Sequence, residues 1–307
     1  MLRIHKEPFI QNITEDWMLD TGLQLFIKRE DVIHPYVSGN KWRKLKYNLE
    51  EAKQQGFSKL LTFGGAFSNH IYATAAAAKE AGLVSVGIIR GEELARKPLN
   101  KTLTFSHEQG MRLHFVSRAD YREKTALSFL NILKEQFGDF YLIPEGGTNP
   151  LAIKGTTEIL NDDTKVYDYI TASVGTGGTI AGIITAAEPH QQVVGFSALK
   201  GDFLFAEVNR LITENDGLWG HKSWKATDAN WHLKTNYHCG GYAKTPDYLM
   251  AFIEAFEKKH QVLLDPIYTG KMMYGIYDLI ESGYFKRGSQ ILAIHTGGLQ
   301  GRKVKIV

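Results

Sequence analysis

Two lysines one helical turn apart, Lys41 and Lys44, are the residues best placed to do covalent chemistry. They lie in the segment Ser38-Gly39-Asn40-Lys41-Trp42-Arg43-Lys44-Leu45, where Ser38 or Asn40 could cap a helix. At spacing i and i+3 they share one face of that helix. A phosphate-bearing aldehyde cofactor would use one lysine as the amine nucleophile and the other as the counter-charge of its phosphate. A lysine becomes nucleophilic when desolvation or a nearby cation lowers its pKa, but two lysines on one face are more often a solvated surface.

Four glycine-rich turns follow expected strands, at residues 64–65, 146–147, 175–178 and 297–298. Ligands of open parallel sheets bind outside the carboxyl ends of the strands. A single glycine pair is as consistent with a turn that has no functional role as with a binding site. Four such turns in one chain favour a site that they surround together.

The turn after Ser173 has the features of a phosphate cradle. It lies between a strand and a helix and consists of Gly175, Thr176, Gly177, Gly178 and Thr179. Backbone N–H groups converge at such a helix N-terminus, and the helix dipole favours an anion there. The GxGxxG pattern fails because its third glycine position holds Ile180, and no Gly-Lys-Ser/Thr follows. The turn therefore fits one phosphate better than a dinucleotide or a nucleoside triphosphate.

The turn after the strand at 59–63 reads Gly64-Gly65-Ala66-Phe67-Ser68-Asn69-His70. Ser68, Asn69 and His70 stand at the start of an expected helix, where a substrate carboxylate would be stabilised. Plain capping of the helix by Ser68 or Asn69 explains the same residues.

Short apolar runs alternate with longer helical segments, which is typical of an α/β fold built from parallel βαβ units. Strands are expected at 59–63, 84–89, 113–116, 140–143, 167–174, 193–198 and 290–295. Helices are expected at 69–81, from Pro98 to near Gly110, and at 121–137, 151–160 and 179–187. The stretch 217–241 lacks this rhythm and predicts an irregular connection, near a site or simply at the surface.

Composition excludes several classes of function. The 307 residues carry 36 Lys and Arg against 33 Asp and Glu, and a net charge of +3 indicates no nucleic-acid partner. The weakly polar stretch 170–187 is broken at 175–178, so we expect no membrane span. Cys239 is the single cysteine, which excludes an internal disulfide and suits the cytoplasm. A free cysteine such as this one most often serves packing.

Five segments, in order, resemble the fold-type-II pyridoxal-phosphate enzymes. Within them the chain is similar to the branch that holds 1-aminocyclopropane-1-carboxylate (ACC) deaminase and D-cysteine desulfhydrase. The segments are SGNKWRKL from Ser38, GGAFSNH from Gly64, SVGTGGTIAG from Ser173, DPIYTGK from Asp265 and HTGG from His295. The resemblance covers nearly the whole chain and implies pyridoxal 5'-phosphate as the cofactor, a small amino acid as the substrate and no metal ion.

The resemblance also implies roles for individual residues. Lys41 carries the Schiff base, and Lys44 joins Gly175–Thr179 at the phosphate. Asn69 hydrogen-bonds the ring hydroxyl of the cofactor. Ser68, near the reacting carbon, grips the substrate carboxylate together with His70. The active-site tyrosines are Tyr242 and Tyr268.

Thr269 and Thr296 decide the expected reaction. ACC deaminases typically place a glutamate at the ring nitrogen, in DPxYEGK, whereas this chain has Thr269 there and Thr296 in HTGG. Hydroxyl partners leave the ring a weaker electron sink, which suffices to eliminate a good leaving group from Cβ. We therefore expect α,β-elimination, with D-cysteine as the leading substrate. Lys41 or a tyrosinate would remove the α-proton, and the products would be a 2-oxo acid and ammonia.

Three alternatives remain at this point. They are ACC deamination in the same fold, a dinucleotide-dependent oxidoreductase, and a ligand binder without catalysis. The resemblance further implies two α/β domains, with residues 44–150 forming the smaller domain and residues 1–43 and 151–307 the larger, PLP-binding one. It also implies a homodimer. We expect His295 to be structural, and Trp219, Trp224 and Trp231 to order the irregular connection or an interface.

Overall fold

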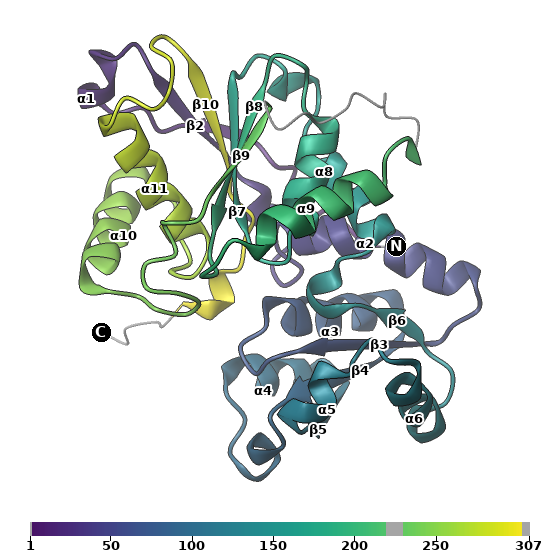
Figure 1. Cartoon of the computed structure of the whole chain (residues 1–307). Helices are drawn as coiled ribbons and strands as arrows, with labels where there is room; N and C mark the ends of the chain where they lie inside the picture. The colour runs from purple at the N-terminus through teal and green to yellow at the C-terminus, as the bar shows by residue number, and fades with distance from the viewer. Residues whose placement is uncertain (1, 219–229, 303–307) are drawn as a thin grey trace.

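The computed structural model describes residues 2–218 and 230–302, which form two sheets with helices on both faces of each (Figure 1). The larger sheet has the order β1-β2-β10-β7-β8-β9. All its neighbours pair in parallel except β1 and β2, which are antiparallel. Its strands are β1 (Ile10–Asn12), β2 (Gln24–Lys28), β10 (Gln290–Ile294), β7 (Tyr169–Val174), β8 (Gln192–Ser197) and β9 (Trp231–Lys234).

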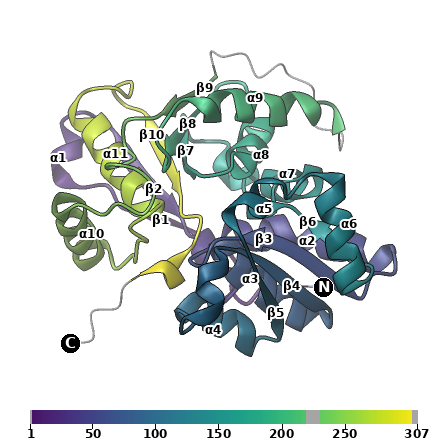
Figure 2. The ribbon, with the colours of Figure 1, turned by 60° about the horizontal axis from the view of Figure 1, so that its bottom comes forward.

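The smaller sheet is entirely parallel and has the order β5-β4-β3-β6 (Figure 2). Its strands are β5 (Met111–Val116), β4 (Val84–Arg90), β3 (Lys59–Gly64) and β6 (Tyr141–Ile143). The helices around it are α3 (Asn69–Ala81), α4 (Lys101–Glu108), α5 (Arg118–Arg122) and α6 (Leu127–Phe137). One parallel sheet and one that is parallel except at β1 confirm the predicted α/β class.

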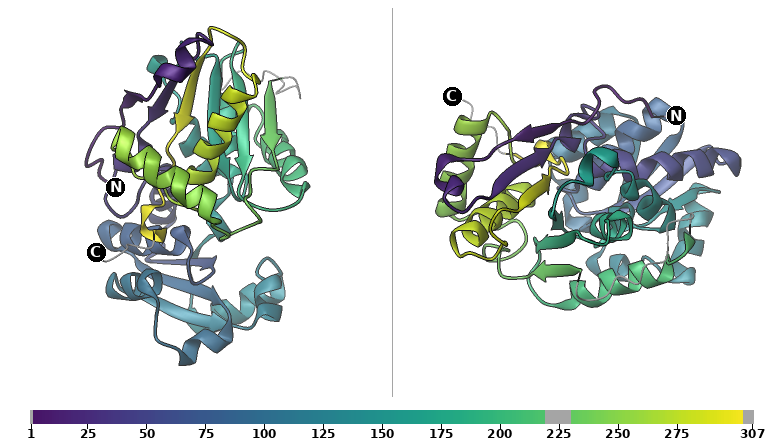
Figure 3. Two further views of the ribbon diagram at one scale, coloured as in Figure 1. Left: turned by 90° about the vertical axis from the view of Figure 1, so that its left-hand side faces the viewer. Right: turned by 90° about the horizontal axis from the view of Figure 1, so that it is seen from above.

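Helices cover both faces of the larger sheet, as the side views show (Figure 3). They are α1 (Asp16–Leu19), α8 (Gly178–Ala186), α9 (Phe203–Glu214), α10 (Asp247–His260) and α11 (Thr269–Glu281). Successive side chains of a strand point to opposite faces. In β10, Ile291 and Ala293 accordingly pack in the core under α10 and α11, whereas Leu292 and Ile294 pack in the core under α8 and α9. A strand buried on both faces is apolar throughout, which is why it is recognisable in the sequence.

Two helices, α2 (Asn40–Gln54) and α7 (Pro150–Thr157), lie between the two sheets. α7 contacts α2 on one side and α8 on the other. Farther along α2, Leu45 and Leu49 share a core with the alanines of α3. Residue 44 therefore lies inside a helix that packs against helices of both sheets. The domain boundaries at 44 and 150 stay predictions.

The expected elements are present with ends within three residues of the prediction, apart from two corrections. The helix expected at 121–137 is two helices, α5 and α6. An α-helix turns by about 100° per residue, so in one straight helix the side chains of Tyr121 and Leu133 would point in directions about 120° apart. Both side chains are nevertheless buried against the smaller sheet, which requires a break between them. The second correction is β9, which lies within the stretch 217–241 that was expected to be irregular.

Of the three tryptophans expected to order this connection, Trp231 is buried in β9, where its ring stacks on Phe205. Trp219 and Trp224 lie outside the described residues. Among the described helices, none is both long and apolar enough to cross a membrane. The homodimer and the cytoplasmic location stay predictions.

Candidate active site

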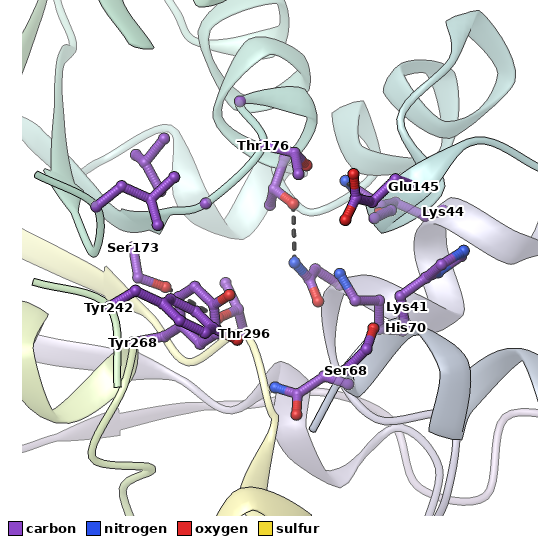
Figure 4. A pocket seen from close by; sticks show the side chains of 18 of the residues that line it. Lys41, Lys44, Ser68, His70, Glu145, Ser173, Thr176, Tyr242, Tyr268 and Thr296 are labelled. Carbon is purple, nitrogen blue, oxygen red and sulfur yellow. Dashed lines mark hydrogen bonds between the residues drawn. The ribbon is translucent and has the colours of Figure 1, made fainter. Parts of the chain in front are cut away.

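A cavity of about 540 Å³ lies where carboxyl ends of strands from both sheets meet. Its walls include Ser68 after β3, Arg90 at the end of β4, Glu145 after β6, Gly175 after β7 and Thr296 after β10. Figure 4 shows the two tyrosines with Ser173 and Thr296 on one side, and Lys41, Lys44 and Glu145 on the other. The glycine turns thus surround one site, as the sequence predicted.

Lys41 stands in the first turn of α2, and a close backbone approach fixes that turn. Gly39 has φ +57°, and a Cβ there would lie 2.0 Å from the Thr296 carbonyl oxygen. The Asn40 N–H donates to the same oxygen at 3.2 Å. The residue before the helix must therefore be glycine, and neither Ser38 nor Asn40 caps α2. Instead the Asn40 amide donates to Thr179 Oγ1 at 2.8 Å, which ties α2 to the start of α8.

Burial lowers the pKa of Lys41 to about 8. The ammonium loses water around it, and this disfavours the charged form. Lys44 is 1% exposed, and its Nζ donates to the Gly146 carbonyl and to Thr148 Oγ1, at 3.1 and 3.0 Å. Its pKa is lowered well below the usual value, first by burial and then by the charge of Lys41. The two lysines line the cavity together and are not a solvated surface.

Arg43, between the two lysines, points away from them into a buried ion pair. Its guanidinium donates to both carboxylate oxygens of Glu30, at 3.0 and 3.1 Å, and Glu30 is fully buried. A bidentate pair of this kind fixes geometry as well as charge. It holds α2 against the segment after β2, so that the lysines keep their place.

The turn 175–179 opens toward the cavity at the N-terminus of α8. Gly177, with φ +82°, precedes the first helical residue, Gly178. A Cβ on Gly178 would lie 2.8 Å from Thr148 and 3.1 Å from Lys44 Nζ, so only glycine leaves the lysine this close to the helix start. Thr176 Oγ1 lies 2.7 Å from Thr148 Oγ1. Backbone N–H groups, hydroxyls and a buried amine therefore converge here, as a phosphate requires.

The turn after β3 supplies the opposite wall. Ser68 Oγ accepts the Ile71 N–H at 3.2 Å, so Ser68 caps α3 and also lines the cavity. Asn69 lines the cavity and lies against Gly298, where a Cβ would be 2.6 Å from its amide nitrogen. The N-terminus of α3 is thus directed into the site and suits a carboxylate.

His70 lies deeper than the sequence suggested. It is 2% exposed, and its Nε2 lies 2.8 Å from Thr62 Oγ1 while its Nδ1 lies 3.5 Å from Thr74 Oγ1. Burial, and then the charges of Lys41 and Lys44, lower its pKa well below the usual value. His70 is therefore a neutral ring with both nitrogens facing threonines, at the floor of the cavity.

Tyr242 and Tyr268 face each other edge to face, with ring centroids 6.1 Å apart. Tyr268 immediately precedes α11, and burial, followed by the proximity of Tyr242, raises its pKa well above the usual value. Lys271 Nζ donates to the Gly241 carbonyl at 2.8 Å, which holds the loop that carries Tyr242. Lys271, the last residue of DPIYTGK, thus positions Tyr242.

The two threonines expected at the ring nitrogen occupy different places. Thr296 lines the cavity, and its hydroxyl lies 3.2 Å from Ser173 Oγ. Thr269 is fully buried and outside the cavity wall, and its hydroxyl donates to Asp265 Oδ2 at 2.8 Å. The DPIYTGK segment forms a tight turn here, because the Asp265 carboxylate also accepts the backbone N–H groups of residues 267–269. The structure therefore pairs Thr296 with Ser173 and leaves Thr269 as part of the turn.

Comparison with known proteins agrees with this geometry. Residues 17–297 match the family described as pyridoxal-phosphate dependent enzyme. The chain belongs to that family. It is similar to the bifunctional D-cysteine desulfhydrase/ACC deaminase of Arabidopsis thaliana, with 34% identity over 94% of this chain and 75% of that one.

That relative places the chain in the ACC deaminase and D-cysteine desulfhydrase branch of the family, and two further similarities agree with it. The D-cysteine desulfhydrase of Salmonella choleraesuis is 29% identical over 90% of this chain and 87% of that one. The crystal structure of an ACC deaminase homologue superposes with a TM-score of 0.83 and 29% identity, covering 98% of this chain and 92% of that one. The predicted family and fold type are confirmed.

The residues present fit pyridoxal phosphate, the cofactor of the family. The cavity offers an amine with a pKa of about 8, a glycine cradle at the start of α8 and a second buried lysine beside that cradle. Lys41 would hold the aldehyde carbon, and Lys44 would lie with Gly175–Thr179 at the phosphate.

Among the cavity-lining residues to which sequence reasoning gave no site role are three with polar or charged side chains, Ser173, Arg90 and Glu145. Each stands at or just after the carboxyl end of a parallel strand, and that position was the available signal. Two other residues are structural. Cys239 is buried and its thiol faces the Tyr237 carbonyl, whereas His295 bridges the Leu263 carbonyl and the Gly297 N–H.

Proposed function

We propose that the protein is a pyridoxal-phosphate-dependent lyase that removes the Cβ substituent of a small amino acid, with D-cysteine as the leading substrate. The overall reaction is D-cysteine plus water to pyruvate, ammonia and hydrogen sulfide. Bound pyridoxal phosphate supplies the electrophile for the substrate amine and the sink for the electrons of the Cα–H bond.

The observation that carries this proposal is the hydroxyl pair of Ser173 and Thr296. Among the described residues that line the cavity, Glu145 provides the one carboxylate, and Figure 4 shows it across the cavity from Thr296. We infer that hydroxyls rather than a carboxylate meet the ring nitrogen. Such a ring is a weaker electron sink, which suits elimination of a thiolate better than opening of a cyclopropane.

The remaining roles follow from the charge states. Lys41, with a pKa of about 8, has enough free amine at neutral pH to take up the α-proton once the substrate amine has replaced it. Tyr268 stays protonated, because its pKa is raised, and is suited to give a proton to the leaving sulfur rather than to act as a tyrosinate base. Ser68 and Asn69, at the start of α3, bind the substrate carboxylate. His70 acts indirectly, as the neutral floor beneath them.

ACC deamination is the second candidate, because the similar Arabidopsis protein is named for both activities. The test is parallel turnover of D-cysteine, L-cysteine and ACC by the holoenzyme, with Lys41→Ala as the blank. Pyruvate and sulfide from D-cysteine support the proposal. Formation of 2-oxobutyrate from ACC would show that the hydroxyl pair does not prevent ring opening. No product from any of the three would overturn the assigned substrates.

A further inference from the structure

One guanidinium in the cavity wall has no part in the chemistry described above. Arg90 is the last residue of β4, is exposed, and lines the cavity. Its Nη2 would lie 3.8 Å from a Cβ on Gly65, so it stands beside the turn that leads to Ser68.

Arg90 is held in place without being neutralised. Within residues 2–218 and 230–302, no hydrogen bond or ion pair engages its guanidinium, which lies 5.8 Å above the centroid of the Tyr121 ring. The Tyr121 hydroxyl donates to Glu145 Oε1 at 2.7 Å, and Lys124 Nζ lies 3.4 Å from Glu145 Oε2. The nearest carboxylate of the cavity therefore has other partners for both oxygens, and the donors of Arg90 remain available to a ligand.

Among the described residues that line it, the cavity consequently has one cation more than the proposed reaction uses. Lys41 and Lys44 serve the cofactor, and the start of α3 serves the substrate α-carboxylate. We propose that Arg90 is a specificity-determining residue that binds a second anionic group, on the side chain of the amino-acid substrate. A planar guanidinium matches a carboxylate, sulfonate or phosphate with two parallel hydrogen bonds. This inference rests on the proposed function, and it adds to D-cysteine, as further substrates, amino acids whose Cβ substituent carries an anionic group.

A matched pair of substrates isolates the second charge. S-Carboxymethylcysteine and its side-chain amide have nearly the same shape and differ by one negative charge. Elimination breaks the Cβ–S bond, the sulfur leaves with the electron pair and takes up a proton, and water releases pyruvate and ammonia. The coproduct is thioglycolate from the acid and its amide from the neutral substrate. O-Phosphoserine and 3-sulfoalanine serve as phosphate and sulfonate probes, each in both configurations.

The experiment measures kcat and KM for pyruvate formation, and binding through the absorbance of the cofactor, with the wild-type holoenzyme and three variants. These are Arg90→Gln, Arg90→Lys and, as a control, Arg112→Gln on the neighbouring strand β5, where the exposed arginine lies outside the cavity wall. We expect the wild type to favour the acid over the amide at least ~10-fold in kcat/KM, because a charge-assisted hydrogen bond is worth about that much or more. Arg90→Gln should abolish this preference by raising KM for the acid alone. Arg90→Lys should restore part of it, and Arg112→Gln should retain it.

Three results would overturn the inference. The first is a wild type without preference for any anionic probe, and the second is a preference that survives Arg90→Gln. The third is an equal loss of kcat/KM for the acid and the amide in Arg90→Gln, which would assign Arg90 to the α-carboxylate. If no amino acid yields pyruvate, the proposed function fails, but the absorbance titration still decides whether Arg90 selects the second anion.

Discussion

Replacing Lys41, the lysine proposed to bind the cofactor, by methionine should stabilise the cofactor-free protein. The free amine of Lys41 has a pKa of about 8 in the folded chain, against 10.5 for an ordinary lysine. The difference of 10.5 − 8, about 2.5 units at about 1.36 kcal/mol each, is a desolvation cost of roughly 3 kcal/mol. Lys41→Met removes the buried charge, so at pH 7 its free energy of unfolding should exceed the wild-type value by up to this amount.

The pH dependence has a definite sign. Between pH 8 and 10.5 the folded chain has released the Lys41 proton while the unfolded chain still binds it. The unfolded state then binds more protons, so wild-type stability rises with pH across this window. Below pH 8 Lys41 is protonated in the folded chain as well, so its desolvation cost is present in full. The advantage of Lys41→Met should therefore be largest at pH 7 and should shrink by pH 10.

The assay is equilibrium urea unfolding of the cofactor-free proteins at several pH values between 7 and 10. Lys53→Met is the matched control, because Lys53 lies in the same helix α2 and is exposed. It should change the free energy of unfolding little at any pH. The reasoning is refuted if Lys41→Met is no more stable than the wild type at pH 7, or if its advantage does not depend on pH.

Three further substitutions and one control substitution test other parts of the site. Lys44→Gln should weaken pyridoxal-phosphate binding by ~10–100-fold, because a hydrogen bond to a charged group contributes about that much. An absorbance titration measures this Kd, and an unchanged value would contradict the proposed place of Lys44 at the phosphate. Gly39→Ala should cost ~2 kcal/mol or more of stability and abolish turnover, because its Cβ would lie 2.0 Å from the Thr296 carbonyl. Gly56→Ala, with φ +78° but open space around it, should cost only ~1 kcal/mol, and equal losses would refute the steric argument. Tyr268→Phe should lower kcat by ~10²–10⁴ with little change in KM, and an unaltered kcat would exclude proton transfer by its hydroxyl.

Most of the fold could be predicted because buried parallel strands are short, apolar and followed by glycine turns. β3, α3 and β4 start at the predicted residues for this reason. The split between α5 and α6 could not be predicted from helix propensity, since it depends on the sheet against which both must pack. β9 has no local signal either. It is a four-residue edge strand whose hydrogen bonds go to β8, far away in the sequence.

The site shows the same division between local and long-range information. Lys41, Ser68 and Thr296 lie in motifs beside glycines, and the structure brings them to one cavity. The orientation of Thr269 could not be predicted, because the competing acceptor, Asp265, belongs to the same motif and only the turn geometry decides between them. Arg90 is a single charged residue after a strand, and its place becomes visible only once both sheets are assembled.

The helix that carries the lysines explains how a site built from two sheets is preorganised. At its start, α2 is fixed to the larger sheet by the contact of Gly39 with Thr296 and to α8 by the Asn40–Thr179 hydrogen bond. Farther along, its leucines share a core with α3, whose N-terminus presents Ser68. α2 therefore sets both the distance from Lys41 to the turn 175–179 and the distance from Lys41 to the start of α3. With the proposed roles, we expect a disturbance of α2 to weaken the binding of cofactor and substrate together, and loss of the Ser68 hydroxyl to weaken the binding of the substrate alone.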